Sequence, residues 1–439
     1  MDPGRRPGSR SRMPNRIARR PEGGKMTKNR GPEFRQGDWV ESVNALGKGL
    51  GDDGRSMISL DPNVVMAAAV ENTGLSDFGD DDWFVEPLYA LCKALELTLL
   101  GRVMARHEVQ LLLQNRLRIE DTLKKNPHIL DEPIENPIFV CGLGRSGTTV
   151  LHELLSEDPA HRVPQLWEMR HSVPPPETAT YGSDARIGVA DREIALLDKI
   201  DLDFSTMHIN AGDKPNECIF LFGLQFLGDF FLGQYNVPSF IMATATKDLT
   251  PVYAYHKKVL QLLQWKHPGE RWVLKCPAHL ARLDFLFKVY PDARIVVTHR
   301  DPLRVMSSMS NLTTHLKAMR SEVPNAEGDM WAAAFGEKML LDEYMALRDK
   351  LTDKADQIID LRYQDLMKDA LSTVRTIYTH WGLPFSDETQ QRVRAYIDSH
   401  PQGQHGRHKY SFDDTGFDLA EERTKFAAYQ ERFDVPSEV

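Results

Sequence analysis

The chain has little cysteine, and its cysteines do not form the pattern of a disulfide framework or a zinc site. Only four occur among 439 residues, and no two of them form a Cys-x-x-Cys pair. Each stands in an apolar segment, at Cys92, Cys141, Cys218 and Cys276. This usage is typical of buried thiols that stay reduced. We therefore expect a protein of a reducing compartment.

The sequence also shows no secretory signal and no long hydrophobic run. Its basic first residues are not followed by an apolar segment of the kind that a signal peptide contains. The most apolar stretch, Ile219 to Gly233, is too short to cross a bilayer and contains Gln225 and Asp229. We therefore expect no transmembrane segment and, together with the reduced thiols, a cytoplasmic location.

The chain has fewer basic than acidic residues, with 54 Lys and Arg against 63 Asp and Glu and a net charge of -9. Neutralising nucleic-acid phosphates requires a basic face, so we expect no nucleic-acid partner. Residues 1–36 are the exception, because they contain eleven Lys and Arg and only three acidic residues. This segment is rich in proline and glycine and has almost no apolar periodicity, which predicts a disordered tail. A solvated extension is the simplest interpretation, and an anchor on an anionic surface is the alternative.

The remaining pattern predicts an α/β fold. Residues 37–130 form a helical N-terminal preface, in which two apolar runs at helical spacing are separated by Gly101. From residue 131 to 439 short apolar runs alternate with helical patterns, and helices alone are expected from about residue 364. The predicted strands are 138–141, 272–275, 294–298 and 357–361. The alternation indicates βαβ units, hence a three-layer P-loop-type domain with a central parallel sheet of about four or five strands.

The first predicted strand leads into a glycine-rich loop and a helix, in the segment PIFVCGLGRSGTTVLHELL. Gly142 and Gly147 have the spacing G-x-x-x-x-G of a phosphate-binding loop. Glycines let backbone N–H groups turn inward around an anion, and the helix N-terminus adds a partial positive charge. Thr148 and Thr149 supply hydroxyl donors. The segment therefore predicts a phosphate site.

The loop departs from that of a nucleoside triphosphatase at one position. Such enzymes have lysine after the second glycine, where this chain has Thr148. The cation is instead Arg145, inside the loop. No apolar strand clearly ends in an aspartate for Mg²⁺, although Asp301 and Asp360 are weak candidates. The loop is thus suited to a phosphate other than a magnesium-chelated triphosphate.

In this form, G-x-x-R-S-G-T-T after a strand, the loop resembles the 5′-phosphosulfate loop of the sulfotransferase family. The bacterial and tyrosylprotein enzymes show the closest pattern. The resemblance implies 3′-phosphoadenosine 5′-phosphosulfate (PAPS) as the sulfuryl donor and no metal. It also implies that Arg145 neutralises the departing phosphate. The 5′-phosphate ligands that it implies are Gly144, Ser146, Gly147, Thr148 and Thr149.

A second segment resembles the same family, in PDARIVVTHRDPLRVMSSMSNL. Arg300 ends a predicted strand, and Asp301 and Pro302 have the residue types of a helix N-cap and first helical position. Ser308 follows eight residues after Arg300. A guanidinium at a strand end and a hydroxyl near a helix start can bind one phosphate. The resemblance implies that Arg300 and Ser308 bind the 3′-phosphate.

Three further segments are similar to the family. Lys275 ends the strand Trp272-Val-Leu-Lys and would stand beside the transferring sulfuryl group. Tyr363 matches a tyrosine that reaches the 3′-phosphate. Arg407 and Lys409 belong to a glycine- and histidine-rich loop like one that covers the nucleotide. The histidines around that loop have no carboxylate or cysteine at ligand spacing, so we expect no metal there.

The acceptor must lose a proton during sulfuryl transfer, so the sequence is expected to supply a base. Glu168 is the favoured candidate, because the tyrosylprotein branch has a glutamate at a similar distance beyond the loop arginine. The alternatives are His208, Glu217 and His152, of which His152 fits a packed helix residue better.

We therefore predict an enzyme that transfers a sulfuryl group from PAPS to a hydroxyl or amine of a small-molecule, lipid or glycan acceptor. Segments 218–233 and 226–240 are apolar and aromatic, which fits either an acceptor pocket or plain core helices. A P-loop kinase that uses ATP and Mg²⁺ is one alternative, and a non-catalytic nucleotide-binding module is another. A requirement for Mg²⁺ would distinguish the kinase.

Overall fold

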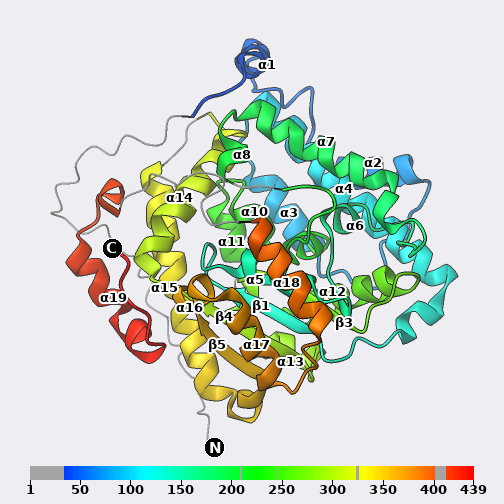
Figure 1. Cartoon of the computed structure of the whole chain (residues 1–439). Coiled ribbons are helices and arrows are strands. Elements are labelled where there is room, and N and C mark those ends of the chain that lie inside the picture. Colours follow the sequence, from blue (N-terminus) through cyan, green and yellow to red (C-terminus); the bar gives the residue numbers. More distant parts are fainter. Residues whose placement is uncertain (1–33, 208–209, 245, 323–325, 401–411) are drawn as a thin grey trace, which may run out of the picture.

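A sheet of five parallel strands forms the centre of the computed structural model (Figure 1). The structure describes residues 34–207, 210–244, 246–322, 326–400 and 412–439. The strands lie in the order β2-β3-β1-β4-β5. Their bounds are β1 Ile138–Gly142, β2 His161–Arg162, β3 Arg271–Lys275, β4 Arg294–His299 and β5 Ile358–Arg362. The predicted α/β class and parallel sheet are confirmed, and the two-residue edge strand β2 is an addition to the four predicted strands.

The central strand β1 sets the register of the sheet. Ile138 lies opposite Val273 of β3 on one side and opposite Arg294 of β4 on the other. All five residues of β1 are buried, as expected for a parallel strand that is covered on both faces. Because the strands are parallel, their carboxyl ends meet at one edge of the sheet. The loop after β1, Lys275, Arg300 and Tyr363 are brought to that edge together.

Alternate side chains of the strands enter two different helical layers. Ile138, Val140 and Val296 point to one face, which is covered by α5 (Thr148–Ser156), α16 (Tyr363–Lys368), α17 (Ala370–His380) and α18 (Asp387–Ser399). Phe139 and Ile295 point to the other face, into a larger core that includes α4 (Leu99–Lys125), α12 (Thr250–Gln264) and α13 (Leu283–Val289). The result is the predicted three-layer arrangement.

The N-terminal helices pack into that larger core. They are α1 (Asp38–Gly49), α2 (Pro62–Thr73), α3 (Val85–Ala94) and α4 (Leu99–Lys125). The break between α3 and α4 falls before Thr98, whose side chain caps α4, and not at Gly101 as the sequence suggested. Gly101 lies inside α4, where a Cβ atom would come within 2.0 Å of the Arg320 carbonyl oxygen. The glycine therefore permits close helix packing and does not interrupt the helix.

Short helices connect these layers. They are α6 (Leu166–Arg170), α7 (Ala185–Ile200), α8 (Phe204–Met207), α9 (Ile219–Gly223), α10 (Gly228–Leu232) and α11 (Pro238–Thr244). Turns of 3-10 helix occupy Pro127–Asp131, Tyr181–Ser183, Pro277–His279, Thr352–Gln357 and Phe412–Thr415. The helical pattern over 216–230 is thus divided into α9 and α10. The backbone reverses between them at Phe226, which has a φ of 53°.

Three more helices belong to the larger core and lie beside one another in Figure 1, namely α14 (Pro302–Ala318), α15 (Ala326–Lys350) and α19 (Leu419–Arg432). Asp360 of β5 joins them through a buried network. Its carboxylate accepts hydrogen bonds from His299 (2.9 Å), Arg348 (3.0 Å) and Tyr344. The other ring nitrogen of His299 contacts the hydroxyl of Tyr429 at 2.9 Å. The network fixes α15 and α19 against the strand end that precedes Arg300.

None of the helices in the described part of the chain is long and apolar enough to cross a membrane. All four cysteines belong to the described residues and are free thiols. Burial raises the pKa of Cys92 to about 12, so its thiol is protonated at neutral pH and unreactive. The cytoplasmic location stays a prediction.

Candidate active site

The loop between β1 and α5 closes on itself. The backbone N–H of Ser146 donates to the Leu143 carbonyl at 3.2 Å. The Ser146 hydroxyl donates to the same oxygen at 2.6 Å and contacts the Thr298 hydroxyl at 2.7 Å. The Ser146 side chain is fully buried, and these contacts of its hydroxyl shape the loop. The role of Ser146 as a 5′-phosphate ligand stays a prediction.

Gly147 is required at the start of α5 for two reasons. Its φ of 92° belongs to the left-handed region, which residues other than glycine rarely adopt. A Cβ atom here would also lie 2.9 Å from the Tyr363 ring. The glycine thus allows the loop to turn toward the helix N-terminus while the aromatic ring of Tyr363 packs directly against it.

Two arginines meet at this loop from different strands. The Nε of Arg145 donates to the Ser308 hydroxyl at 3.1 Å. Arg300 donates from Nη1 to the Arg145 carbonyl at 2.9 Å, and its guanidinium lies over the Tyr363 ring at 3.9 Å. The structure therefore brings together four residues that the sequence placed up to 218 positions apart. They form a cationic group at the carboxyl edge of the sheet, suited to phosphates.

Lys275, the last residue of β3, lies on the other side of the loop. Its ammonium donates to Glu217 at 2.6 Å and to the Thr149 hydroxyl at 3.3 Å. The Cys218 backbone N–H donates to the Lys275 carbonyl at 2.9 Å, which holds the neighbouring Glu217 in place. Lys275 itself is only 3% exposed. The pair therefore presents a carboxylate to the cavity and keeps the ammonium behind it.

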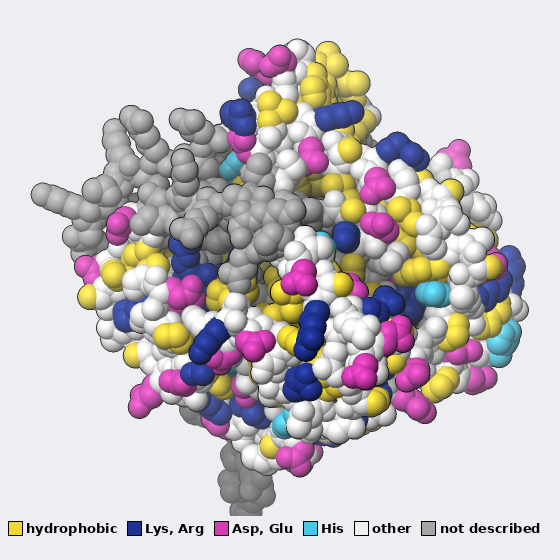
Figure 2. Space-filling view, in the orientation of Figure 1, with side chains coloured by type: hydrophobic (Ala, Val, Ile, Leu, Met, Phe, Trp, Pro, Cys, Tyr) yellow, Lys and Arg dark blue, Asp and Glu magenta, His cyan; other side chains and the backbone are white. Residues whose placement is uncertain are grey.

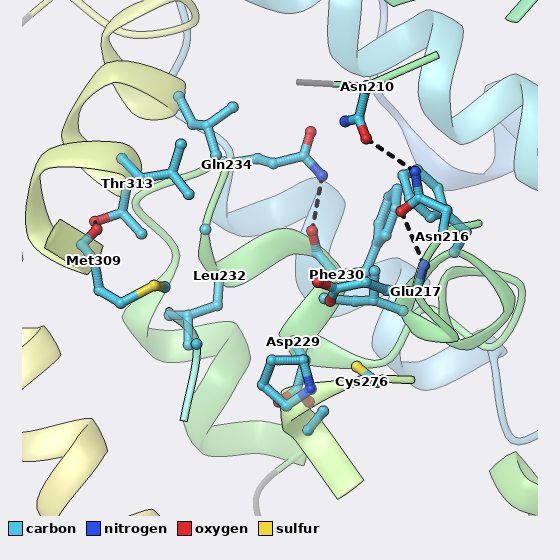
Figure 3. A pocket seen from close by; sticks show the side chains of 18 of the residues that line it. Asn210, Asn216, Glu217, Asp229, Phe230, Leu232, Gln234, Cys276, Met309 and Thr313 are labelled. Atoms are coloured by element: carbon cyan, nitrogen blue, oxygen red, sulfur yellow. Dashed lines mark hydrogen bonds between the residues drawn. The ribbon is translucent and has the colours of Figure 1, made fainter. Parts of the chain in front are cut away.

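A cavity of about 1160 Å³ opens over these groups. Its polar end is lined by Gly144, Arg145, Gly147, Thr148, Thr149, Glu217, Arg300 and Tyr363. Figure 3 shows Glu217 and Asn216 on one side of it and Met309 and Thr313 on the other. Phe230 and Leu232 of α10 lie between them, with Asp229 nearby. The cavity thus extends from the loop after β1 to a wall formed by helices that are far from this loop in the sequence.

The rest of the lining is mainly apolar. It includes Leu100, Val103 and Met104 of α4, Leu196 and Leu197 of α7, and Leu312 and Leu316 of α14. Sequence analysis did not identify α4 and α7 as part of the site, because their patterns indicate only amphipathic helices. In Figure 2, hydrophobic side chains also gather on the surface around α1 and α7, at the top of the molecule.

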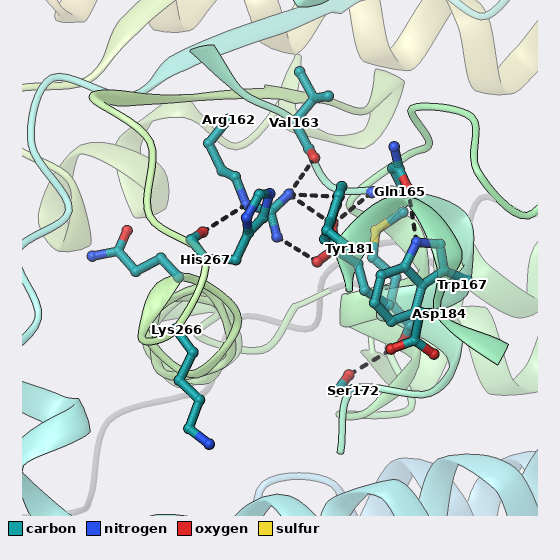
Figure 4. A network of polar contacts seen from close by, with 12 residues as sticks. Arg162, Val163, Gln165, Trp167, Ser172, Tyr181, Asp184, Lys266 and His267 are labelled. Carbon is teal, nitrogen blue, oxygen red and sulfur yellow. Dashed lines mark hydrogen bonds and ion pairs between the residues drawn. The ribbon is translucent and has the colours of Figure 1, made fainter. Parts of the chain in front are cut away.

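Glu168 lies outside this cavity, in a buried network of polar contacts. Its carboxylate accepts hydrogen bonds from Arg162 (2.8 Å), Tyr181 (2.9 Å) and the backbone N–H of Gln165 (2.8 Å). Arg162 also pairs with the second carboxylate oxygen. Figure 4 shows Arg162 at the centre of these contacts, beside Tyr181 and His267.

The position of Glu168 argues against the prediction that it is the base. Its side chain is 0% exposed and is not among the residues that line the cavity. The carboxylate instead completes a capping box at the start of α6, where Gln165 is the N-cap. The spacing Gln-x-x-Glu was visible in the sequence and is the signal that identifies this structural role.

His152 is also excluded as the base by its surroundings. It is fully buried in α5, and its Nε2 contacts the Val273 carbonyl at 3.1 Å. Burial and, to a smaller extent, the nearby Lys275 lower the pKa of His152 to about 3. The other alternative, His208, and the predicted nucleotide ligands Arg407 and Lys409 lie outside the described residues.

Comparison with known proteins identifies the family. Residues 137–387 match the model of the Sulfotransferase family, which is more than half of the chain. The chain belongs to the sulfotransferase family. The crystal structure of sulfotransferase STF9 from Mycobacterium avium is similar, with a TM-score of 0.78 and 28% identity over 86% of this chain and 97% of that one. Sulfotransferase STF1 from Mycobacterium tuberculosis gives 0.74 and 33%, over 83% and 98%.

A curated relative has a named activity. It is the omega-hydroxy-beta-dihydromenaquinone-9 sulfotransferase Stf3 of Mycobacterium bovis, 27% identical over 291 residues, which are 60% of this chain and 67% of the relative. These findings confirm the predicted reaction class, so the chain is an enzyme that transfers a sulfuryl group. The loop, the two arginines and the cavity are the candidate site of that reaction.

Glu168→Gln should destabilise the folded sulfotransferase. The substitution leaves the buried Arg162 guanidinium without its countercharge, and breaking such a pair costs about 3–5 kcal/mol. Urea unfolding of the purified variant measures the loss. Glu157→Gln is the control, because Glu157 makes only a partly exposed pair with Arg392 at 3.8 Å, worth about 0–1 kcal/mol. A stable Glu168→Gln variant that has lost turnover would restore Glu168 as a catalytic candidate.

Proposed function

We propose that this sulfotransferase takes its sulfuryl group from PAPS. The observation that carries the proposal is the meeting of two separate anion-binding groups at one edge of the sheet. The loop backbone from Gly144 to Thr149, with the hydroxyls of Thr148 and Thr149, is suited to the 5′-phosphosulfate. Arg300 and Ser308 are suited to a second phosphate, the 3′-phosphate that distinguishes PAPS from other adenosine nucleotides. Tyr363, Arg407 and Lys409 are further ligands implied by the family resemblance.

The reaction is an in-line displacement at sulfur. An acceptor oxygen forms a bond to sulfur while the bond from sulfur to the 5′-phosphate oxygen breaks. Adenosine 3′,5′-bisphosphate leaves with the electron pair of that bond, and Arg145 offsets its new charge. Lys275 offsets charge on the sulfuryl oxygens. Positioning and charge neutralisation supply most of the catalysis in such transfers.

Glu217 replaces Glu168 as our proposed base. It lines the cavity, and its carboxylate is 2.6 Å from the Lys275 ammonium, which in turn is 3.3 Å from Thr149 of the loop. This chain of contacts holds the carboxylate beside the point where the loop would present the sulfuryl group. Glu217 would accept the proton that the acceptor hydroxyl loses.

The proposed reaction uses no metal ion, as the family resemblance implies. Within the described ranges no three His, Cys, Asp or Glu residues are grouped to hold one. Both weak candidates from the sequence have other partners, because Asp301 caps α14 and pairs with Arg423 at 2.6 Å, while Asp360 joins the His299 network. The cationic side chains at the loop take the place of Mg²⁺ as the countercharge.

The acceptor that best fits the cavity is an apolar, lipid-like alcohol. The cavity wall beyond Glu217 is mainly hydrophobic, and the Mycobacterium bovis relative is named for a menaquinone substrate. Residues of the segment 218–233 are divided between the cavity wall and the core, the two alternatives that the sequence left open. Ile219, Phe220 and Phe230 line the cavity, whereas Phe222 and Phe226 are buried in the core. Burial of a long alkyl or isoprenoid chain would drive binding.

Adenosine 3′,5′-bisphosphate should raise the melting temperature of the protein in the presence of EDTA. A ligand that binds only the folded state stabilises it by about 2.7 kcal/mol at one hundred times its dissociation constant. Differential scanning fluorimetry measures the shift, with ATP and Mg²⁺ as the comparison. A larger shift with ATP and Mg²⁺ would favour the kinase alternative and contradict PAPS as donor.

Glu217→Gln should lower turnover about 10²- to 10⁴-fold, the usual contribution of a general base. Binding of adenosine 3′,5′-bisphosphate should stay near that of wild type, since the amide oxygen can still accept from Lys275. Asp229→Asn is the matched control, because Asp229 lines the same cavity but pairs with Arg282 at 2.6 Å. An active Glu217→Gln variant beside an inactive Asp229→Asn variant would move the base to Asp229.

Lengthening an unbranched primary alcohol should increase kcat/KM until the cavity is filled. Each buried methylene contributes about 0.8 kcal/mol, which corresponds to roughly a three- to fourfold gain. Mass spectrometry of the sulfated products measures the series. Leu316→Gln should flatten the slope, because Leu316 lines the cavity, whereas Leu46→Gln on the exposed face of α1 should not. A flat series in the wild-type enzyme would argue against a lipid-like acceptor.

A further inference from the structure

The segment after α19 returns to the proposed 3′-phosphate site. Glu438 forms a bidentate ion pair with Arg300, in which Nε donates to Oε1 at 3.0 Å and Nη2 donates to Oε2 at 2.8 Å. Gln364, next to Tyr363, donates to the same carboxylate at 2.9 Å. Glu438 lies 51 residues beyond the end of the family match at residue 387. It is therefore a contact that the family motifs do not include.

The backbone of this segment is held independently of the Glu438 side chain. The N–H of Glu438 donates to Asp301 at 2.6 Å, and Arg423 of α19 donates to the other Asp301 oxygen at 2.6 Å. Arg423 also donates to the Val439 carbonyl at 2.8 Å. Asp301 is the N-cap of α14 and is fully buried. The segment is thus fixed against the residue that directly follows Arg300.

The contacts of Arg300 leave part of its guanidinium for a ligand. Glu438 takes the edge formed by Nε and Nη2, the Arg145 carbonyl takes one N–H of Nη1, and Tyr363 covers one face. A guanidinium has five N–H groups, so one remains on each terminal nitrogen. Arg300 lines the cavity, whereas Glu438 is not among the residues that line it. The carboxylate therefore contacts Arg300 from outside the cavity that Arg300 lines.

We propose that Glu438 is a positioning residue for the donor, which holds Arg300 in the orientation that receives the 3′-phosphate. This inference rests on the proposed role of Arg300. An arginine side chain has many rotamers, so an arginine that is already oriented loses less entropy when it binds phosphate. The contrasting arrangement is a carboxylate that competes with the 3′-phosphate for Arg300. The two arrangements predict opposite changes in affinity when Glu438 is removed.

Calorimetric titration of Glu438→Ala with two nucleotides tests the proposal. Adenosine 3′,5′-bisphosphate should bind about tenfold more weakly than to wild type, at the lower end for a charge-assisted contact. Adenosine 5′-phosphate lacks the 3′-phosphate, so its affinity should change less than about twofold. Glu438→Gln should lie between wild type and Glu438→Ala for the bisphosphate, because the amide oxygen still accepts one N–H. Ser437→Ala is the control for disturbance of the segment and should bind both nucleotides as wild type does.

A double-mutant cycle with Arg300→Ala separates positioning from a general structural effect. Arg300→Ala should weaken binding of the bisphosphate selectively, and adding Glu438→Ala to it should cause no further loss. If Glu438 only stabilised the fold, Glu438→Ala would instead weaken the binding of both nucleotides. The same loss would then also appear in the Arg300→Ala background. Either of those results would overturn the proposal.

Two other outcomes are informative in different ways. Tighter binding of the bisphosphate by Glu438→Ala would show that the carboxylate competes with the 3′-phosphate, and unchanged binding would show that Arg300 needs no orientation. Both overturn the role of Glu438 and leave the donor assignment intact, provided that Arg300→Ala still discriminates between the nucleotides. If Arg300→Ala weakens both nucleotides equally, the assignment of Arg300 to the 3′-phosphate fails as well.

Discussion

The parallel arrangement of the central strands governs the candidate site of this sulfotransferase. The carboxyl ends of β1, β3, β4 and β5 meet at one edge, and each strand leads into a residue of the proposed donor site. Positive charge is concentrated at that edge, where the backbone N–H groups at the start of α5 lie with two arginines and one lysine. Because these cations come from separate strands, their spacing depends on the register of the sheet and not on one loop alone.

Buried ion pairs maintain that spacing. Arg162 with Glu168 fixes the start of α6 under the cavity, and Asp301 with Arg423 joins α14 to α19. The Asp360 network holds β5 to the strand end before Arg300. An unpaired charge at any of these positions would be expensive to bury, so the pairs restrict how the helices can pack. The pair of Lys275 and Glu217 differs, because its carboxylate faces the cavity.

The proposed acceptor side of the cavity is formed by helices, whereas the proposed donor side is formed by strand ends. Its wall comes from α4, α7, α10 and α14, which are far apart in the sequence and contribute mainly apolar side chains. The N-terminal helices are therefore part of the core, and α4 among them also lines the cavity, even though these helices precede the family match. Because the two sides come from different elements, the helices around the cavity can vary while the strand ends stay the same.

The sequence by itself determined the strands, the phosphate loop and the segment around Arg300, because local patterns encode them. Glycine spacing, apolar runs and an Asp-Pro helix start each reflect the conformation of a few adjacent residues. Only the tertiary structure decided which carboxylate faces the cavity. Glu168 and Glu217 look alike in the sequence, but one meets Arg162 in the interior and the other meets Lys275 at the loop. The same holds for Ser146, whose hydroxyl is used by Thr298, and for Glu438, which reaches Arg300 across 138 residues. Such contacts depend on how distant segments pack, and no local pattern specifies them.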